Sequence, residues 1–265
     1  MTLYFLGGGN MAAAIIAGLR RAAYPHAVAV AERCADKRAR LHAQFGVQTL
    51  ESLPPQLHGD DVLVLAVKPQ DMAEACAGVD TGGALVLSIA AGLPVSALSQ
   101  MLGGTRRIVR IMPNTPAAVA SGVSGLYAAE GASAHDRERA DAVMRSCGEC
   151  VWLDTEEQMH AITAVSGSGP AYVFYLLNAL QQAAQTLGFS PEHAKMLSLA
   201  TFRGAVDLAA QSSDDFAVLQ QQVTSKGGTT HAALASLRRD DVAQAVTRAA
   251  HAAAHRSREM AQTAP

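Results

Sequence analysis

Aromatic residues are scarce in this chain of 265 residues, at 5%, although 49% of the residues are hydrophobic. Alanine, valine and leucine must therefore fill most of the core. No apolar run reaches the roughly 20 residues that a membrane span needs. The formal net charge is only -2, so there is no electrostatic reason to expect nucleic-acid binding. The N-terminus lacks the basic segment and cleavage site of a secretory signal, and we expect a cytoplasmic protein.

Cysteine is also rare, and two of the four cysteines form a C-x-x-C at Cys147 and Cys150. Such a pair can be a redox motif or half of a zinc site. The redox motif belongs near the start of a helix, but here residues 151–153 have the pattern of a strand. A zinc site needs two more ligands nearby, and the sequence has no second C-x-x-C and no H-x₃-H. We interpret the pair as structural.

The first half of the chain alternates short apolar runs with helical stretches, which is the pattern of a parallel α/β sheet. The run at 62–67 is continuously apolar, as expected of a central strand buried on both faces. A helix is predicted at 12–22. The predicted strands are 3–6, 27–31, 62–67, 84–89, 107–111, 123–127 and 150–153.

After about residue 155 no convincing strand pattern remains, and long alanine-rich helical segments follow at 171–187, 191–210 and 241–262. Ser190 and Pro191 have the residue types of a helix start, and Gly188 before them is typical of a helix stop. We therefore predict an α/β dinucleotide-binding domain at 1–155 and an all-helical domain at 156–265.

Gly7, Gly9 and Ala12 fit the pattern G-x-G-x-x-[G/A] between a predicted strand and a predicted helix. The first glycine permits a tight turn, the second lets a pyrophosphate approach the backbone, and the small third residue lets helix and strand pack closely. The pyrophosphate would then lie at the N-terminus of the helix. This pattern predicts a Rossmann-type dinucleotide site.

The choice of dinucleotide stays open in the sequence. Glu32 ends the second predicted strand, where an acid can bind the ribose hydroxyls of NAD. Arg33, Lys37 and Arg38 follow it and could instead hold the 2′-phosphate of NADP, or could form a solvated helix start. Lys68 ends the central strand and could be a proton donor, a phosphate contact or a structural cation.

Two glycines and two threonines precede a helical pattern near the C-terminal end, in residues 223–234. Such a turn can aim backbone N–H groups and a hydroxyl at a small anion, although a simple helix cap has the same composition. His231 directly after the turn is interpreted as a helix surface residue. His251 and His255 are spaced for a metal, but no partner carboxylate is evident.

The segment 166–170, Ser-Gly-Ser-Gly-Pro, has two interpretations. Small residues before a proline at an early helix position favour a tight inter-domain junction. A second phosphate loop is the alternative, but no predicted strand precedes it.

Four segments together resemble the pyrroline-5-carboxylate reductase family: residues 7–11, 112–117, 166–172 and 223–234. The resemblance implies hydride transfer from NADPH, with NADH as the alternative, to the cyclic imine 1-pyrroline-5-carboxylate, which gives L-proline. It implies a catalytic role for Thr230 and a substrate site at Ser225, Gly228, Thr229 and Thr230. It implies cofactor contacts from Leu6, Gly7, Gly8, Gly9, Asn10, Met11, Arg33, Ala66, Val67, Lys68, Pro69, Ala91 and Asn114.

The helical segments 171–187 and 191–210 are apolar over much of their circumference, and such helices need cover on every side. A domain of about 110 residues has limited interior, so a second subunit is the expected cover. The resemblance implies a homodimer, or a higher homo-oligomer built from dimers. It also implies that each active site takes its dinucleotide loops from one subunit and residues 225–230 from the other.

Two rival functions remain. Another imine or β-hydroxy-acid reductase on the same plan should depend on a catalytic lysine in the helical domain, where only Lys195 and Lys226 are present. A non-catalytic NADP-sensing protein has no reason to keep an anion-binding turn. One departure from the family is that relatives commonly have proline where this chain has Lys226, which could loosen the turn or add a cation.

Overall fold

The computed structural model describes residues 1–262 and forms two compact units. The first contains Met1–Ser168 together with residues 252–262, and the second contains Gly169–His251. Residues 156–168 therefore pack with the first unit, where Ile162 lies directly against Gly125. The predicted domains, 1–155 and 156–265, were divided where the strand pattern ends in the sequence. That division stays a prediction.

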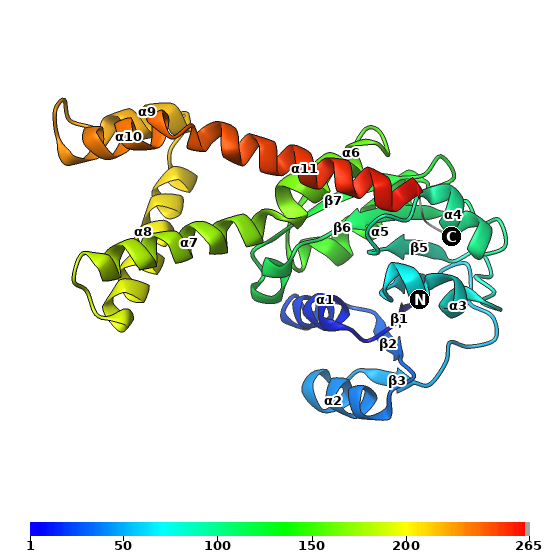
Figure 1. Ribbon diagram of the computed structural model, residues 1–265. Coiled ribbons are helices and arrows are strands. Elements are labelled where there is room, and N and C mark those ends of the chain that lie inside the picture. The colour runs from blue at the N-terminus through cyan, green and yellow to red at the C-terminus, as the bar shows by residue number, and fades with distance from the viewer. Residues whose placement is uncertain (263–265) are drawn as a thin grey trace. The chain divides into compact units, whose positions relative to one another are not determined.

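The first unit is built on one sheet of eight strands in the order β3-β2-β1-β4-β5-β6-β7-β8 (Figure 1). The strands β1 to β6 are parallel, β7 is antiparallel to β6, and β8 is parallel to β7. The sequence predicted all of them except β3, which has three residues. Their bounds are β1 Thr2–Leu6, β2 Ala27–Ala31, β3 Gln48–Leu50, β4 Val62–Leu65, β5 Leu85–Ser88, β6 Ile108–Met112, β7 Gly122–Ala128 and β8 Gly148–Trp152.

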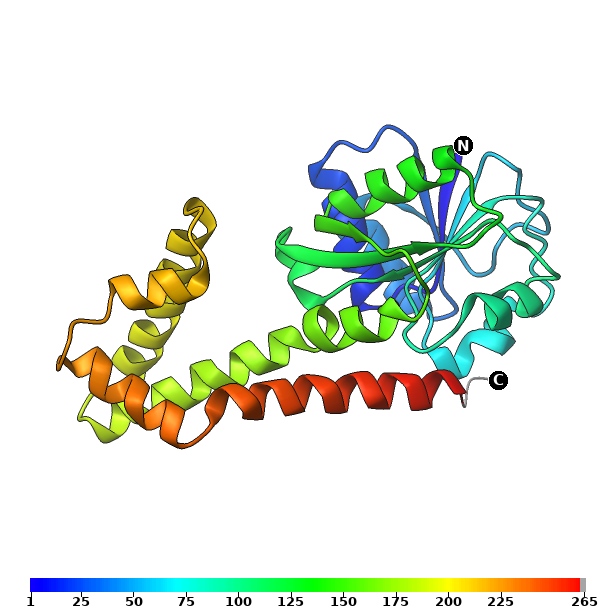
Figure 2. The ribbon, with the colours of Figure 1, turned by 90° about the horizontal axis from the view of Figure 1, so that it is seen from above.

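Helices cover both sides of this sheet (Figure 2). Val62 and Val64 of β4 belong to one apolar core, and Leu63 and Leu65 belong to the other, so the central strand is buried on both faces as predicted. The first core includes α1 Asn10–Arg21, α2 Ala35–Phe45 and α5 Ala134–Arg145; the second includes α3 Met72–Cys76 and α4 Val95–Met101. The remaining helical turns of this unit are η1 Pro69–Asp71, η2 Thr115–Val119, α6 Gln158–Ile162 and the π-helical turn η3 Thr163–Gly167.

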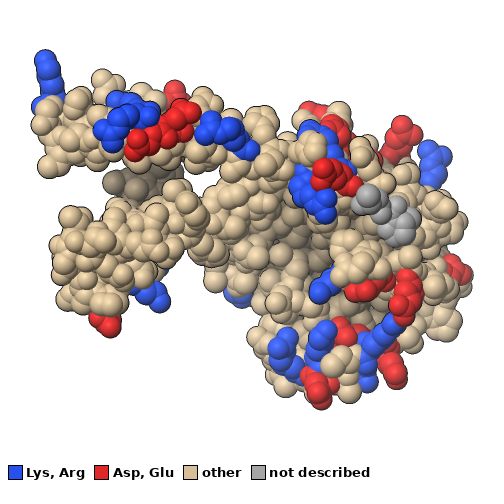
Figure 3. Space-filling model, viewed as in Figure 1, with Lys and Arg blue, Asp and Glu red and all other residues tan. Residues whose placement is uncertain are grey.

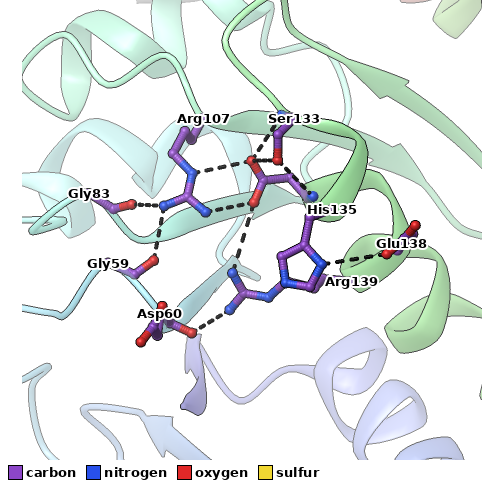
Figure 4. A network of polar contacts seen from close by, with 9 residues as sticks. Gly59, Asp60, Gly83, Arg107, Ser133, His135, Glu138 and Arg139 are labelled. Atoms are coloured by element: carbon purple, nitrogen blue, oxygen red, sulfur yellow. Dashed lines mark hydrogen bonds and ion pairs between the residues drawn. The ribbon is translucent and has the colours of Figure 1, made fainter.

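A buried carboxylate ties α5 to the amino end of β6 (Figure 4). The side chain of Asp136 is only 1% exposed, and its Oδ1 lies 2.6 Å from Nη2 of Arg107. The same carboxylate accepts hydrogen bonds from the backbone N–H and hydroxyl of Ser133, which caps α5. Burial would raise the pKa of Asp136, but the bonds from Arg107 and Ser133 lower it to about 2.

We predict that Asp136→Asn lowers the free energy of unfolding by about 2–3 kcal/mol at pH 7, because roughly two pKa units of charge stabilisation are lost. The pKa of Asp136 is lower in the folded than in the unfolded chain, so its contribution is present above the unfolded pKa. It is lost as the pH falls from about 4 towards about 2. Urea unfolding at neutral and acidic pH measures this difference.

The matched control for Asp136 is Glu138→Gln on the same helix. Its carboxylate is 77% exposed and pairs with His135 at 3.5 Å. A change of at most about 0.5 kcal/mol is expected there. Equal losses in the two variants would show that the buried pair has no special role.

The second unit is helical, and no strand follows β8 among residues 1–262, as predicted. Its helices are α7 Gly169–Thr186, α8 Pro191–Gln211, α9 Phe216–Gln222, α10 Thr229–Arg239 and α11 Val242–Gln262, of which the residues from Ala252 belong to the first unit. The Ser190 hydroxyl caps α8 by accepting a bond from the His193 N–H. No helix in the described part of the chain is long and apolar enough to cross a membrane.

The helices α7 and α8 expose large apolar side chains, and charged residues are sparse on their surface in Figure 3. Phe174 is 65% exposed and Tyr175 is 74% exposed. The group further includes Leu176, Leu180, Met196, Leu199, Val206 and Leu208. One chain by itself thus leaves uncovered the apolar faces that the sequence predicted.

Candidate functional site: a dinucleotide pocket and a separate anion turn

A pocket of about 660 Å³ lies at the carboxyl edge of the parallel strands in the first unit. Ligands of open α/β sheets bind at this edge. The structure brings together there the predicted cofactor residues Leu6, Gly7, Gly8, Gly9, Arg33, Ala66, Val67 and Lys68. The predicted contacts Asn10, Met11, Pro69, Ala91 and Asn114 are not among the lining residues of this pocket.

The glycines at the base of the pocket have different constraints. Gly7 has φ of +100°, and a Cβ there would lie 2.8 Å from Cγ1 of Val67 and 2.9 Å from the carbonyl oxygen of Ala66. A Cβ on Gly9 would meet no atom within 4 Å. Gly7 is therefore required by the fold, whereas Gly9 keeps open a space in the pocket that a side chain would fill.

Gly9 is the N-cap of α1 and provides no side chain to cap it. The N–H of Ala13 is bonded to the Gly9 carbonyl at 3.0 Å, so the N–H groups of the first turn before it have no partner within the helix. Such a turn binds anions, and it lies beside the open space at Gly9. The residues present therefore fit the pyrophosphate of a dinucleotide.

Glu32 is held by the main chain of the glycine loop. Its two carboxylate oxygens accept hydrogen bonds from the N–H of Gly8 at 2.9 Å and of Cys34 at 3.0 Å. Burial would raise the pKa of Glu32, but these two bonds together with the charges of Lys37 and Arg38 lower it. The carboxylate thus stabilises the glycine loop, and its binding of a ribose hydroxyl stays a prediction.

The three cations considered for a 2′-phosphate are placed differently. Nη1 of Arg38 donates to the carbonyl oxygens of Glu32 and Arg33, both at 2.7 Å, and this side chain does not line the pocket. Arg33 and Lys37 do line it, with side chains 72% and 51% exposed. Nη1 of Arg33 lies 2.6 Å from Oε1 of Glu74. The sequence interpretation missed Glu74, because no sequence pattern pairs two residues that are 41 positions apart.

Asn114 has a structural role in the first unit. Its buried side chain donates to the carbonyl oxygen of Ser166 at 3.2 Å and accepts from the N–H of Val123 at 2.9 Å. Its predicted contact with a cofactor stays a prediction. Ser166 itself lies in the π-helical turn η3, so no strand precedes the segment 166–170 and the structure gives no support to a second phosphate loop.

The predicted substrate residues lie together in the second unit: Ser225 and Gly228 in the turn between α9 and α10, and Thr229 and Thr230 at the start of α10. Gly227 has φ of +73°, which favours glycine, and Gly228 is the N-cap of α10 without a side-chain cap. The N–H of Gly228 donates to the carbonyl oxygen of Ser225 at 3.1 Å. The turn therefore holds Ser225 next to the start of an uncapped helix, an arrangement that can bind a carboxylate.

The residues beside this turn and the other metal or redox candidates have ordinary surroundings. Lys226 and His231 are exposed. Nδ1 of His255 lies 3.3 Å from the Glu259 carboxylate, and no group of three or more potential metal ligands occurs among residues 1–262. Cys147 and Cys150 are not in a disulfide. Burial raises the pKa of the Cys147 thiol and raises that of Cys150 to about 11. Neither is therefore a reactive thiolate near neutral pH.

Two family models match the chain in the order of its domains. Residues 2–92 match a family described as NADP oxidoreductase, coenzyme F420-dependent. Residues 156–260 match the dimerisation domain of pyrroline-5-carboxylate reductase. The second match begins where the sequence pattern becomes purely helical.

Similar proteins agree with these matches over nearly the whole chain. The pyrroline-5-carboxylate reductase of Pseudomonas aeruginosa is 42% identical, with 97% of this chain and 96% of the relative covered. The structure of the Coxiella burnetii reductase has a TM-score of 0.89 at 35% identity, covering 99% of this chain and 98% of that one. The Plasmodium falciparum reductase, solved with NADP bound, has a TM-score of 0.86 at 27% identity and 98% coverage of both. This chain belongs to the pyrroline-5-carboxylate reductase family.

Proposed function

We propose that this protein is a pyrroline-5-carboxylate reductase, an NAD(P)H-dependent oxidoreductase that reduces the C=N bond of 1-pyrroline-5-carboxylate to L-proline in the last step of proline biosynthesis. The observation that carries the proposal is similarity to reductases over 97% of the chain. The two matching family models cover the glycine loop and the turn at 225–230. A β-hydroxy-acid reductase would instead need a catalytic lysine in the helical unit. Lys226 is exposed in the anion turn, where its charge can attract a carboxylate.

The pocket of the first unit would hold NADP, with NAD as the alternative. Gly7 and Gly9 shape the backbone, the first turn of α1 binds the pyrophosphate, and Arg33 and Lys37 offer charges for a 2′-phosphate. When bound, the reduced nicotinamide supplies the hydride that adds to the imine carbon. The remaining predicted contacts, Asn10, Met11, Pro69, Ala91 and Asn114, are part of this proposal.

The turn of the second unit would hold the substrate carboxylate through Ser225, Gly228 and Thr229, and the Thr230 hydroxyl would lie near the ring nitrogen. A protonated imine is already electrophilic, so the protein has to position it and does not need a strong general acid. Thr230 is the second residue of α10, so its N–H belongs to the first turn and has no partner within the helix.

We predict that Thr230→Ala lowers kcat/KM by roughly 1–3 kcal/mol of lost hydrogen bonding and leaves NADPH binding nearly unchanged. Steady-state kinetics and equilibrium titration of NADPH separate the two quantities. Thr247→Ala is the matched control, because the Thr247 hydroxyl donates to the Ala243 carbonyl within α11 and lies outside the turn at 225–230. If NADPH affinity falls as much as kcat/KM, Thr230 is a structural cap.

The protein is proposed to be a homodimer or a higher homo-oligomer built from dimers. The support is the match to a dimerisation domain together with the exposed apolar side chains of α7 and α8. Cover from a partner subunit removes this surface from water, which is the expected driving force for association. The cytoplasmic location stays a prediction from the sequence.

A further inference from the structure

We infer that Glu74 is a specificity-determining residue of the dinucleotide pocket, which opposes a phosphate on the adenosine ribose by occupying Arg33 and adding negative charge beside it. The inference rests on the proposed function, since it concerns how this pocket distinguishes NADPH from NADH. Glu74 belongs to α3 and reaches across the pocket to the segment that follows β2.

The Arg33–Glu74 contact is close and lies in solvent. Nη1 and Oε1 are 2.6 Å apart, and both side chains are 72% exposed. Arg33 has no other hydrogen-bond partner for its guanidinium among the bonds that the described residues form. Exposed ion pairs contribute little to stability, so the purpose of this pair is not explained by the fold. A phosphate group that binds Arg33 must first break the Arg33–Glu74 ion pair. It is then repelled by the free carboxylate of Glu74 beside it.

The surrounding charges strengthen this effect. The lining contains the cations Arg33, Lys37 and Lys68 and the anions Glu32, Glu51, Asp71 and Glu74. The Glu32 carboxylate is turned to the backbone of Gly8 and Cys34 and is fixed there. Glu74 is the anion in direct contact with Arg33, so its removal changes the field at Arg33 most.

The test measures dissociation constants of NADPH and NADH by isothermal titration calorimetry for the wild type and for Glu74→Gln. We expect NADPH to bind about threefold to tenfold more tightly to Glu74→Gln, with NADH changed less than about twofold. The gain should shrink at high salt, because the charges are exposed. Arg33→Gln should weaken the binding of NADPH more than that of NADH. In the Arg33→Gln background, adding Glu74→Gln should improve NADPH affinity by a smaller factor than it does in the wild type.

Glu130→Gln is the matched control, because Glu130 forms an exposed pair with Arg106 outside the pocket at 3.6 Å. It should change neither constant, and the thermal midpoints of all variants should be close. Weaker NADPH binding in Glu74→Gln would overturn the inference, since Glu74 would then hold Arg33 in its binding position. Equal changes for both nucleotides would also overturn it. A wild-type protein that binds neither nucleotide would refute the proposed function itself.

Discussion

Gly9→Ala is expected to abolish most NADPH binding while the protein still folds. The dissociation constant of NADPH should rise about 100-fold, equal to about 2.7 kcal/mol, because the added methyl group fills the space through which the pyrophosphate reaches the N–H groups of α1. The free protein has room for the methyl group, since no atom lies within 4 Å of the Cβ position. Its φ of -72° and ψ of -177° suit alanine, so folding should change by at most about 1 kcal/mol.

Equilibrium titration of NADPH together with thermal unfolding measures both halves of this expectation. Gly59→Ala is the matched control, because a Cβ there meets only the Gly82 carbonyl oxygen at 3.8 Å and the position does not line the pocket. It should leave NADPH affinity unchanged. Normal NADPH binding by folded Gly9→Ala protein would show that the pyrophosphate does not use this loop.

Mixing two inactive subunits is expected to restore activity. One subunit carries Gly9→Asp, which puts a carboxylate where the pyrophosphate should bind, and the other carries Thr230→Glu, which puts one in the substrate turn. If each active site takes its glycine loop and its turn from different subunits, one of the two sites in a mixed dimer has both parts intact. A dimer purified through two different tags should then have about half of the wild-type activity.

The same experiment can exclude the shared site. If each site is completed within one chain, every site in the mixed dimer carries one of the two changes and the mixture stays inactive. The two homodimers, each purified separately, provide the background activity. A protein that is monomeric at micromolar concentration by analytical ultracentrifugation would also end the proposal of shared sites.

The sheet could be predicted from the sequence because burial on both faces produces continuous apolar runs. The runs at 62–67 and 84–89 match β4 and β5 closely. The strand β3 was missed because Gln48–Leu50 is short and only partly buried, which leaves no apolar pattern. The helices α7, α8 and α11 lie within one or two residues of their predicted bounds, because each is long and Ser190 and Pro191 mark the start of α8.

The contacts within the site were less predictable. The glycine loop could be predicted because the pattern of its glycines and its position between a strand and a helix together are typical of a dinucleotide site. The sequence interpretation gave Glu32 and Arg33 possible ligands, which stay predictions. It did not foresee that Glu32 accepts a bond from the Gly8 N–H or that Arg33 pairs with Glu74. Contacts between residues 24 and 41 positions apart depend on how β2, α1 and α3 meet at the edge of the sheet. No local periodicity encodes them.

The most direct test of the proposed function is the oxidation of NADPH and of NADH by the purified protein in the presence of 1-pyrroline-5-carboxylate, with L-proline measured as the product. We predict one L-proline formed for each reduced nicotinamide consumed, a rate that depends on the substrate, and a large loss of that rate in Gly9→Ala and Thr230→Ala. Nucleotide binding without any oxidation in the presence of this substrate would contradict the proposal and favour a protein that only senses the dinucleotide.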